Sequence, residues 1–145
     1  MRPTTLTQNA YATPATEGIQ MWRSRTSQFT MHWGRSGAVI TVRGEIDAAN
    51  ATPFAQQTQG LVHRCEWLVL DLAELTFIGT EGFSSIQAIA SRCLNNRTEV
   101  KVIPSPALRT VLRICDPYAR LPLADSLTEA LAEVQRPGRP LRLVP

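Results

Sequence analysis

A short apolar run, EWLVLDL at residues 66–72, constrains the fold of this chain more than any other feature. It is too short to cross a membrane, because a membrane-spanning helix needs about 20 apolar residues. It also lacks the polar residue at every second position that marks a strand with one face in water. The run therefore predicts a strand buried on both faces of a largely parallel sheet. A chain of 145 residues, 43% of them hydrophobic, is large enough for one such domain.

Strands and helices are predicted to alternate on both sides of this run. They are a hairpin formed by strands at 28–33 and 38–44, helices at 47–63, 80–96, 107–115 and from 125 or 126 to 134, and strands at 66–72, 99–103 and 121–124. Strands that alternate with single helices become parallel neighbours through right-handed crossovers. We therefore expect an α/β fold, a mixed, mostly parallel sheet of about five strands packed with four helices, with one sheet face only partly covered.

The two ends of the chain lack this periodicity. Residues 1–27 are rich in Thr, Ser, Gln, Pro and Ala, and are predicted to form a flexible N-terminal segment from which Trp22 is a candidate to pack back onto the domain. The proline-rich residues 137–145 are predicted to form a flexible C-terminal tail, which leaves 28–136 as the folded domain. The N-terminal segment has no apolar stretch typical of a secretory signal, so we expect a cytoplasmic protein.

The charge distribution argues against direct binding of nucleic acid. The formal net charge of +3 comes from the two ends, because residues 28–135 carry nine basic and eleven acidic side chains. A domain that binds nucleic acid has a basic stripe on its folded part. No apolar segment is long enough for membrane insertion either.

No catalytic set, metal site or cofactor motif is present in the sequence. His32 and His63 are not associated with a nucleophile motif, and the glycine patterns of dinucleotide sites and of P-loops are missing. We expect a protein that is not an enzyme and that binds no metal and no cofactor.

The three cysteines, Cys65, Cys93 and Cys115, form no CxxC pair, so the sequence predicts reduced thiols. Cys93 and Cys115 fall at the ends of two helices expected to pack side by side, which makes them a candidate redox pair. Buried, apolar thiols are the favoured interpretation, because a disulfide requires Cα atoms within about 7 Å.

Two segments at matching separation carry a family resemblance. VLDLAELTFIGTEGFSSI, residues 69–86, and GEIDAANA, residues 44–51, resemble two segments of STAS domains, the fold of bacterial anti-sigma factor antagonists. The family patterns are an apolar strand ending in Asp-Leu, then Val-x-Phe-Ile-Asp-Ser-Ser-Gly-Leu opening a helix, and Gly-x-Ile-Asp before the first helix. The last predicted strand and helix also resemble the end of the family fold. The resemblance covers roughly residues 28–135.

The resemblance implies a regulatory binding protein that sequesters a kinase-type anti-sigma factor and so frees a sigma factor for transcription. In that family, the anti-sigma factor phosphorylates the serine before the glycine of Asp-Ser-Ser-Gly, and the phosphate releases the partner. Aligned on Gly82, this position is Glu81, which has no hydroxyl; the preceding serine position is Thr80, and the family aspartate is Gly79. Thr80 is the residual candidate for phosphorylation, ahead of Ser84 and Ser85.

The expected partner surface lies at the starts of two helices. It comprises Gly79, Thr80, Glu81, Gly82, Phe83, Ser84 and Ser85, flanked by Asp47 and Asn50. For Phe83 we favour packing in the core, and for Thr80 the role of helix N-cap. Glu81 either imitates a phosphoserine weakly or simply removes the switch. We favour removal, because a phosphate carries about −1.5 to −2 charge and three acceptor oxygens.

Two further functions fit the same resemblance. One is a STAS subunit of a membrane ABC-type transport complex, which needs no kinase cycle, and the other is a small ligand-sensing module. A homodimer is an additional candidate association.

Overall fold

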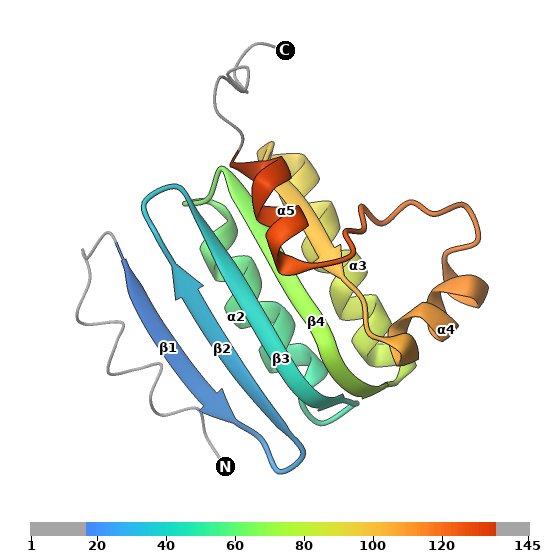
Figure 1. The fold of residues 1–145 in the computed structure, drawn as a ribbon. Helices are drawn as coiled ribbons and strands as arrows, with labels where there is room; N and C mark the ends of the chain where they lie inside the picture. The colour runs from blue at the N-terminus through green and yellow to red at the C-terminus, as the bar shows by residue number, and fades with distance from the viewer. Residues whose placement is uncertain (1–16, 136–145) are drawn as a thin grey trace.

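The fold is a five-stranded sheet with helices packed on both of its faces. The computed structural model describes residues 17–135. The strands are β1 (Gly18–Arg23), β2 (Ser27–Trp33), β3 (Gly37–Ile46), β4 (Trp67–Ile78) and β5 (Glu99–Ile103), and the helices are α2 (Ala51–Val62), α3 (Thr80–Asn96), α4 (Pro106–Cys115) and α5 (Leu127–Val134). The strands lie in the order β1-β2-β3-β4-β5 (Figure 1).

The pairing of the strands confirms the predicted fold class. β1, β2 and β3 are antiparallel neighbours, whereas β3, β4 and β5 run parallel. Short turns join β1 to β2 and β2 to β3, so these strands are antiparallel. The helices α2 and α3 are the crossovers that make β3, β4 and β5 parallel. β4, which contains the apolar run, lies between two parallel strands, and Leu68, Val69 and Leu70 are fully buried.

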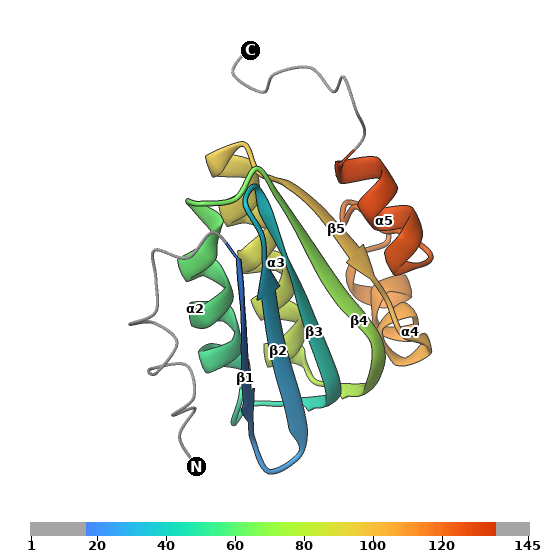
Figure 2. The same cartoon turned by 60° about the vertical axis from the view of Figure 1, so that its left-hand side comes forward.

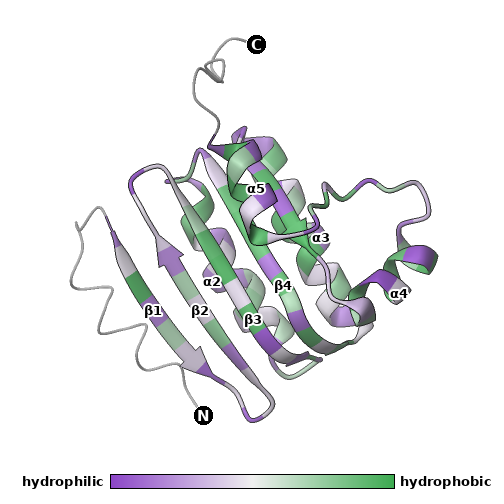
Figure 3. Cartoon of the chain, viewed as in Figure 1, coloured by the Kyte–Doolittle hydropathy of each residue, from purple (hydrophilic) through white to green (hydrophobic). Residues whose placement is uncertain are grey.

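Two hydrophobic cores lie on opposite faces of the sheet. α2 and α3 cover one face, and Leu108 and Leu112 of α4 belong to the same larger core. α5 covers β4 and β5 on the opposite face, where Ala130 and Val134 pack with Val69. Figure 2 shows α2 and α3 on one side of the sheet and α5 on the other. Figure 3 shows the most apolar stretches on β3 and β4, in the middle of the sheet. As expected, one face is only partly covered among the described elements.

The identity of one strand differs from the prediction. Residues 121–124 form only an isolated bridge, in which Leu123 pairs with Val102. The carbonyl of Pro122 accepts from the N–H of Val102, and the N–H of Ala124 donates to the carbonyl of Val102. Because Pro122 has no N–H of its own to donate, the pairing does not extend further. The fifth strand is instead β1, from the segment predicted to be flexible.

The prediction of a flexible segment is therefore wrong for residues 18–27, and the folded domain begins earlier than residue 28. Trp22 is 5% exposed and stacks on Phe29, with ring centroids 4.0 Å apart. Phe29 in turn contacts Phe54 of α2 at 5.7 Å. This aromatic row joins the edge strand to the core, as the expectation for Trp22 required. Residues 1–16 and the predicted tail at 137–145 lie outside the described residues.

The aromatic row predicts that β1 contributes to stability. We expect Trp22→Ala to lower the free energy of unfolding by about 3 kcal/mol, at the low end for a buried tryptophan. We use the low end because Trp22 Nε1 is buried with no hydrogen-bond partner among the described residues. Removing the indole therefore breaks no hydrogen bond. Ile19→Ala, on the exposed side of the same strand, is the control and should cost less than about 1 kcal/mol. Urea unfolding measures both, and equal values would show that Trp22 is not part of the core.

Candidate functional site

The predicted site residues gather where α2 and α3 begin. Both helices follow the carboxyl ends of parallel neighbours, β3 and β4, so their first turns emerge at the same edge of the sheet (Figure 1). Between them lies the α2–α3 groove, with a volume of about 460 Å³. The residues that line it are Ala48, Ala51, Thr52, Ala55, Gln56, Gln59, Thr80, Glu81, Ser84, Ser85 and Ala88.

The start of α2 is fixed by a turn at residues 47–50. The carboxylate of Asp47 accepts hydrogen bonds from the N–H groups of Ala49 at 3.0 Å and Asn50 at 3.3 Å. This local bonding competes with helical geometry, so α2 begins at Ala51 and not at Asp47 as predicted. Asp47 is half-buried beside the groove and does not line it.

Asn50 is 3% exposed and joins three segments beneath this turn. Its side-chain amide donates to the carbonyl of Glu45 at 2.9 Å and to the hydroxyls of Ser27 at 3.0 Å and Ser24 at 3.3 Å. Its amide oxygen accepts from the N–H of Asp47 at 3.0 Å. Because the side chain is buried and fully engaged, Asn50 positions the start of α2 and is not itself a contact surface.

The start of α3 is capped by a glycine. Gly79 is the N-cap, and its N–H donates to the carbonyl of Ile46 at 3.0 Å. The expectation that Thr80 is the N-cap is therefore wrong: Thr80 is the first residue of the helix, and its exposed hydroxyl lies 3.4 Å from the carboxylate of Glu81. Glu81 is exposed in the first turn, where a negative charge interacts favourably with the helix dipole.

Gly82 lets the first turn of α3 lie against the sheet. A Cβ atom there would come within 2.7 Å of Ile78 Cγ1 and 2.8 Å of Ile46 Cγ2, closer than real side chains approach. Phe83 is 6% exposed and belongs to the core, as favoured from the sequence.

The two serines of this helix have different surroundings. Ser84 is exposed and lines the groove. Ser85 is 8% exposed, and its hydroxyl donates to the carbonyl of Ala51 at 3.0 Å, which joins α3 to the start of α2. Of the predicted surface residues, Thr80, Glu81 and Ser84 are therefore accessible, whereas Asn50, Gly82 and Ser85 hold the groove in shape.

The α2 side of the groove was not predicted from the sequence. Thr52, Gln56 and Gln59 occupy one face of α2, three to four residues apart. The apolar spacing of α2 predicts only its buried face, and these polar side chains lie outside that pattern. Most of the lining side chains are small, and Glu81 is the one that carries a charge. The groove can therefore admit close approach of a partner helix but offers no cation.

The candidate redox pair of Cys93 and Cys115 is not formed, because both thiols are free. The favoured interpretation of buried thiols is confirmed for Cys93, which is fully buried in the larger core, and is wrong for Cys115, which is exposed on α4. Thr98 joins the backbones of Cys65 and Cys93: its hydroxyl donates to the Cys65 carbonyl at 2.8 Å, and the N–H of Thr98 donates to the Cys93 carbonyl at 2.8 Å. Burial raises the pKa of Cys65 to about 11 and, with the nearby Cys65 adding to the effect, the pKa of Cys93 to about 12. Both are therefore protonated, weakly reactive thiols at neutral pH.

Comparison with known sequences and structures identifies the family. The sequence pattern of the STAS domain matches residues 33–130. The chain belongs to the STAS domain family.

One relative is similar to this chain in sequence, and solved structures are similar to it in fold. Osmosensory protein A of Mycobacterium tuberculosis is 30% identical over 100 residues, which are 66% of this chain and 63% of that protein. An anti-sigma factor antagonist from Mycobacterium paratuberculosis superposes with a TM-score of 0.65 at 24% identity, over 81% of this chain and 94% of the other. The anti-sigma factor antagonist SpoIIAA in its unphosphorylated form superposes with a TM-score of 0.60 at 17% identity, over 81% of this chain and 96% of SpoIIAA. Within residues 17–135, no helix is both long and apolar enough to span a membrane.

The close contact at Gly82 predicts a test of how the site is built. Gly82→Ala should lower the free energy of unfolding by about 1–3 kcal/mol, because Ile46 and Ile78 must move to admit the methyl group. Gly60→Ala in α2 is the matched control, since a Cβ there meets nothing within 4 Å. It should stabilise the protein by about 0.5–1 kcal/mol through helix propensity. A stabilising Gly82→Ala would show that α3 does not lie this close to the strands.

Proposed function

We propose that this protein is an anti-sigma factor antagonist that binds a kinase-type anti-sigma factor through the α2–α3 groove and has no phosphorylation switch at the usual position. It acts by sequestering that partner, which frees a sigma factor for transcription. The observation that carries the proposal is the placement of Thr80, Glu81 and Ser84 together on an accessible groove, at the segment that resembles the family's switch. The fold shared with anti-sigma factor antagonists supports the same assignment.

The groove has the properties of a protein-binding surface. Its alanine, serine and threonine side chains are short, so a partner helix can approach the backbones of α2 and α3 closely. Its walls are held by Ser85 and Asn50, so little ordering is needed on binding. No catalytic chemistry is required of it.

Glu81 decides the regulatory behaviour in this proposal. Glu81 lacks the hydroxyl on which the family serine carries its phosphate, and its single charge is a weak substitute for that phosphate. Its exposed position in the first turn of α3 is accounted for by the helix dipole alone. The protein is accordingly a constitutive binder, whose activity is set by its amount or by its partner.

The sequence relative also suggests the condition under which this protein acts. The likeness to Osmosensory protein A makes osmotic change the first input to examine. The match covers 63% of Osmosensory protein A, so the likeness concerns only that part of the relative.

A substitution in the groove tests the binding surface. Ser84→Arg places a long cation in the groove and should weaken binding of the anti-sigma factor by at least about tenfold. Asn95→Arg is the matched control, because it adds the same side chain at an exposed position near the other end of α3. It should leave the affinity within about twofold. Isothermal titration with the purified anti-sigma factor measures both.

Two outcomes would contradict the proposal. Equal affinities of Ser84→Arg and wild type would place the partner elsewhere. Much tighter binding by Glu81→Ala would mean that Glu81 acts as a built-in mimic of the released state.

A further inference from the structure

A second surface lies on the other side of the molecule. It comprises α4 and residues 116–124, which extend beyond β5 at the edge of the sheet opposite β1 (Figure 1). We call it the α4 surface; it contains a hollow of about 380 Å³ that shares no residue with the α2–α3 groove. Leu112 and Leu123 contribute apolar walls, and Arg109 and Arg113 also line it.

Large apolar side chains are exposed on the segment of chain that forms this hollow. Ile114 is 78% exposed and Tyr118 is 80% exposed, which makes Tyr118 the most exposed large apolar residue of the described chain. Tyrosine and arginine are among the residue types most enriched at the energetic centres of protein interfaces. Here Arg109 and Arg113 line the hollow, and Tyr118 lies in the chain between two of its lining residues, Pro117 and Ala119.

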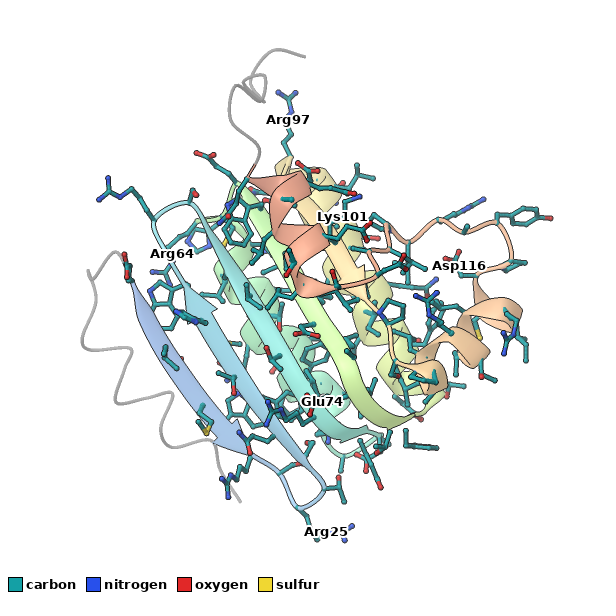
Figure 4. All side chains as sticks on the ribbon, viewed as in Figure 1. Arg25, Arg64, Glu74, Arg97, Lys101 and Asp116 are labelled. Atoms are coloured by element: carbon teal, nitrogen blue, oxygen red, sulfur yellow. The ribbon has the colours of Figure 1, made fainter. Side chains whose placement is uncertain are left out.

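The loop that presents Tyr118 is held in place. The carboxylate of Asp116 accepts hydrogen bonds from the N–H groups of Arg120 at 2.9 Å and Leu121 at 3.0 Å. The backbone carbonyl of Asp116 accepts from the N–H of Ala119. Ala119 has a φ of 52°, in the left-handed region that a residue with a Cβ rarely adopts. Figure 4 labels Asp116 on this side of the molecule.

The charges of this surface are unbalanced. Arg109 pairs with Asp125 at 3.2 Å. Arg113 donates to the hydroxyl of Thr110 at 3.4 Å, and no described carboxylate forms a salt bridge with Arg113 or Arg120. Asp116 also lines the hollow, but its carboxylate accepts from two backbone N–H groups and forms no salt bridge with Arg113 or Arg120. These two exposed guanidinium groups can therefore bind a carboxylate from outside.

We propose that the α4 surface is a second docking site, which binds an acidic segment of a partner protein through Arg113 and Arg120 and receives an apolar side chain of that segment against the hollow and Tyr118. Charge complementarity selects this occupant. A membrane surface is the weaker match, since recognition of anionic lipid uses clusters of about four to eight basic residues. The site is independent of the α2–α3 groove, which offers one negative charge and no positive one.

Fluorescence anisotropy with the full chain tests this proposal. The probe is a fluorescein-labelled 12-residue peptide in which glutamate alternates with leucine, compared at low salt with the same peptide carrying glutamine in place of glutamate. The glutamate peptide should bind at least about tenfold more tightly than the glutamine peptide. The double variant R113Q/R120Q, and separately Tyr118→Ala, should each weaken its binding by about tenfold.

Matched variants elsewhere provide the controls. R23Q/R25Q removes the same charge beside the β1–β2 turn, where Figure 4 labels Arg25 far from Asp116. Leu94→Ala removes an equally exposed apolar side chain from α3. Both should bind the glutamate peptide within about twofold of wild type. The proposal is overturned if R113Q/R120Q binds like wild type, or if vesicles containing phosphatidylserine bind the protein while the glutamate peptide does not.

Discussion

The contact between the first turn of α3 and the ends of β3 and β4 is the constraint on which the site depends. Gly82 has no side chain, so its backbone lies directly on Ile46 and Ile78. That close approach fixes where Thr80, Glu81 and Ser84 project, because helical geometry sets the direction of each from the same turn. The N–H of Gly79, donated to the carbonyl of Ile46, fixes the angle at which the helix leaves β4. A larger residue at position 82 would move the whole accessible side of the groove.

The opposite side of the groove is positioned by polar contacts from distant segments. Asn50 connects the start of α2 to the C-terminal end of β3 and to the turn between β1 and β2. Ser85 connects the start of α2 to α3. The edge strand β1 therefore affects the site in two ways, through the aromatic row that begins at Trp22 and through Ser24 in the turn that follows it. Stability and site geometry are coupled, since loosening β1 would release partners of Asn50.

The sequence predicts most of the fold because periodicity reports burial directly. The run at 66–72, the helix at 80–96 and the strand at 99–103 were recognisable from apolar spacing alone. β1 was missed because its single buried large residue, Trp22, lies in a polar stretch, and the bridge at Leu123 was overestimated because Pro122 limits pairing. At the site, the motif around Gly82 located Thr80, Glu81 and Ser84. Thr52, Gln56 and Gln59 were missed because polar residues on a helix surface carry no pattern, and the links from Asn50 to Ser24 and Ser27 span more than 20 residues of chain. Such contacts arise only once the chain is folded.

The proposed function depends most on the carboxylate at position 81, which in that proposal separates partner binding from phosphorylation. The most direct measurement is the affinity of the purified anti-sigma factor kinase for this protein before and after incubation with ATP and magnesium, with phosphorylation sites identified by mass spectrometry. We expect the same dissociation constant in both conditions for the wild-type protein, and an affinity at least about tenfold lower after ATP for Glu81→Ser. A comparable loss in the wild-type protein, with phosphate on Thr80 or Ser84, would contradict it.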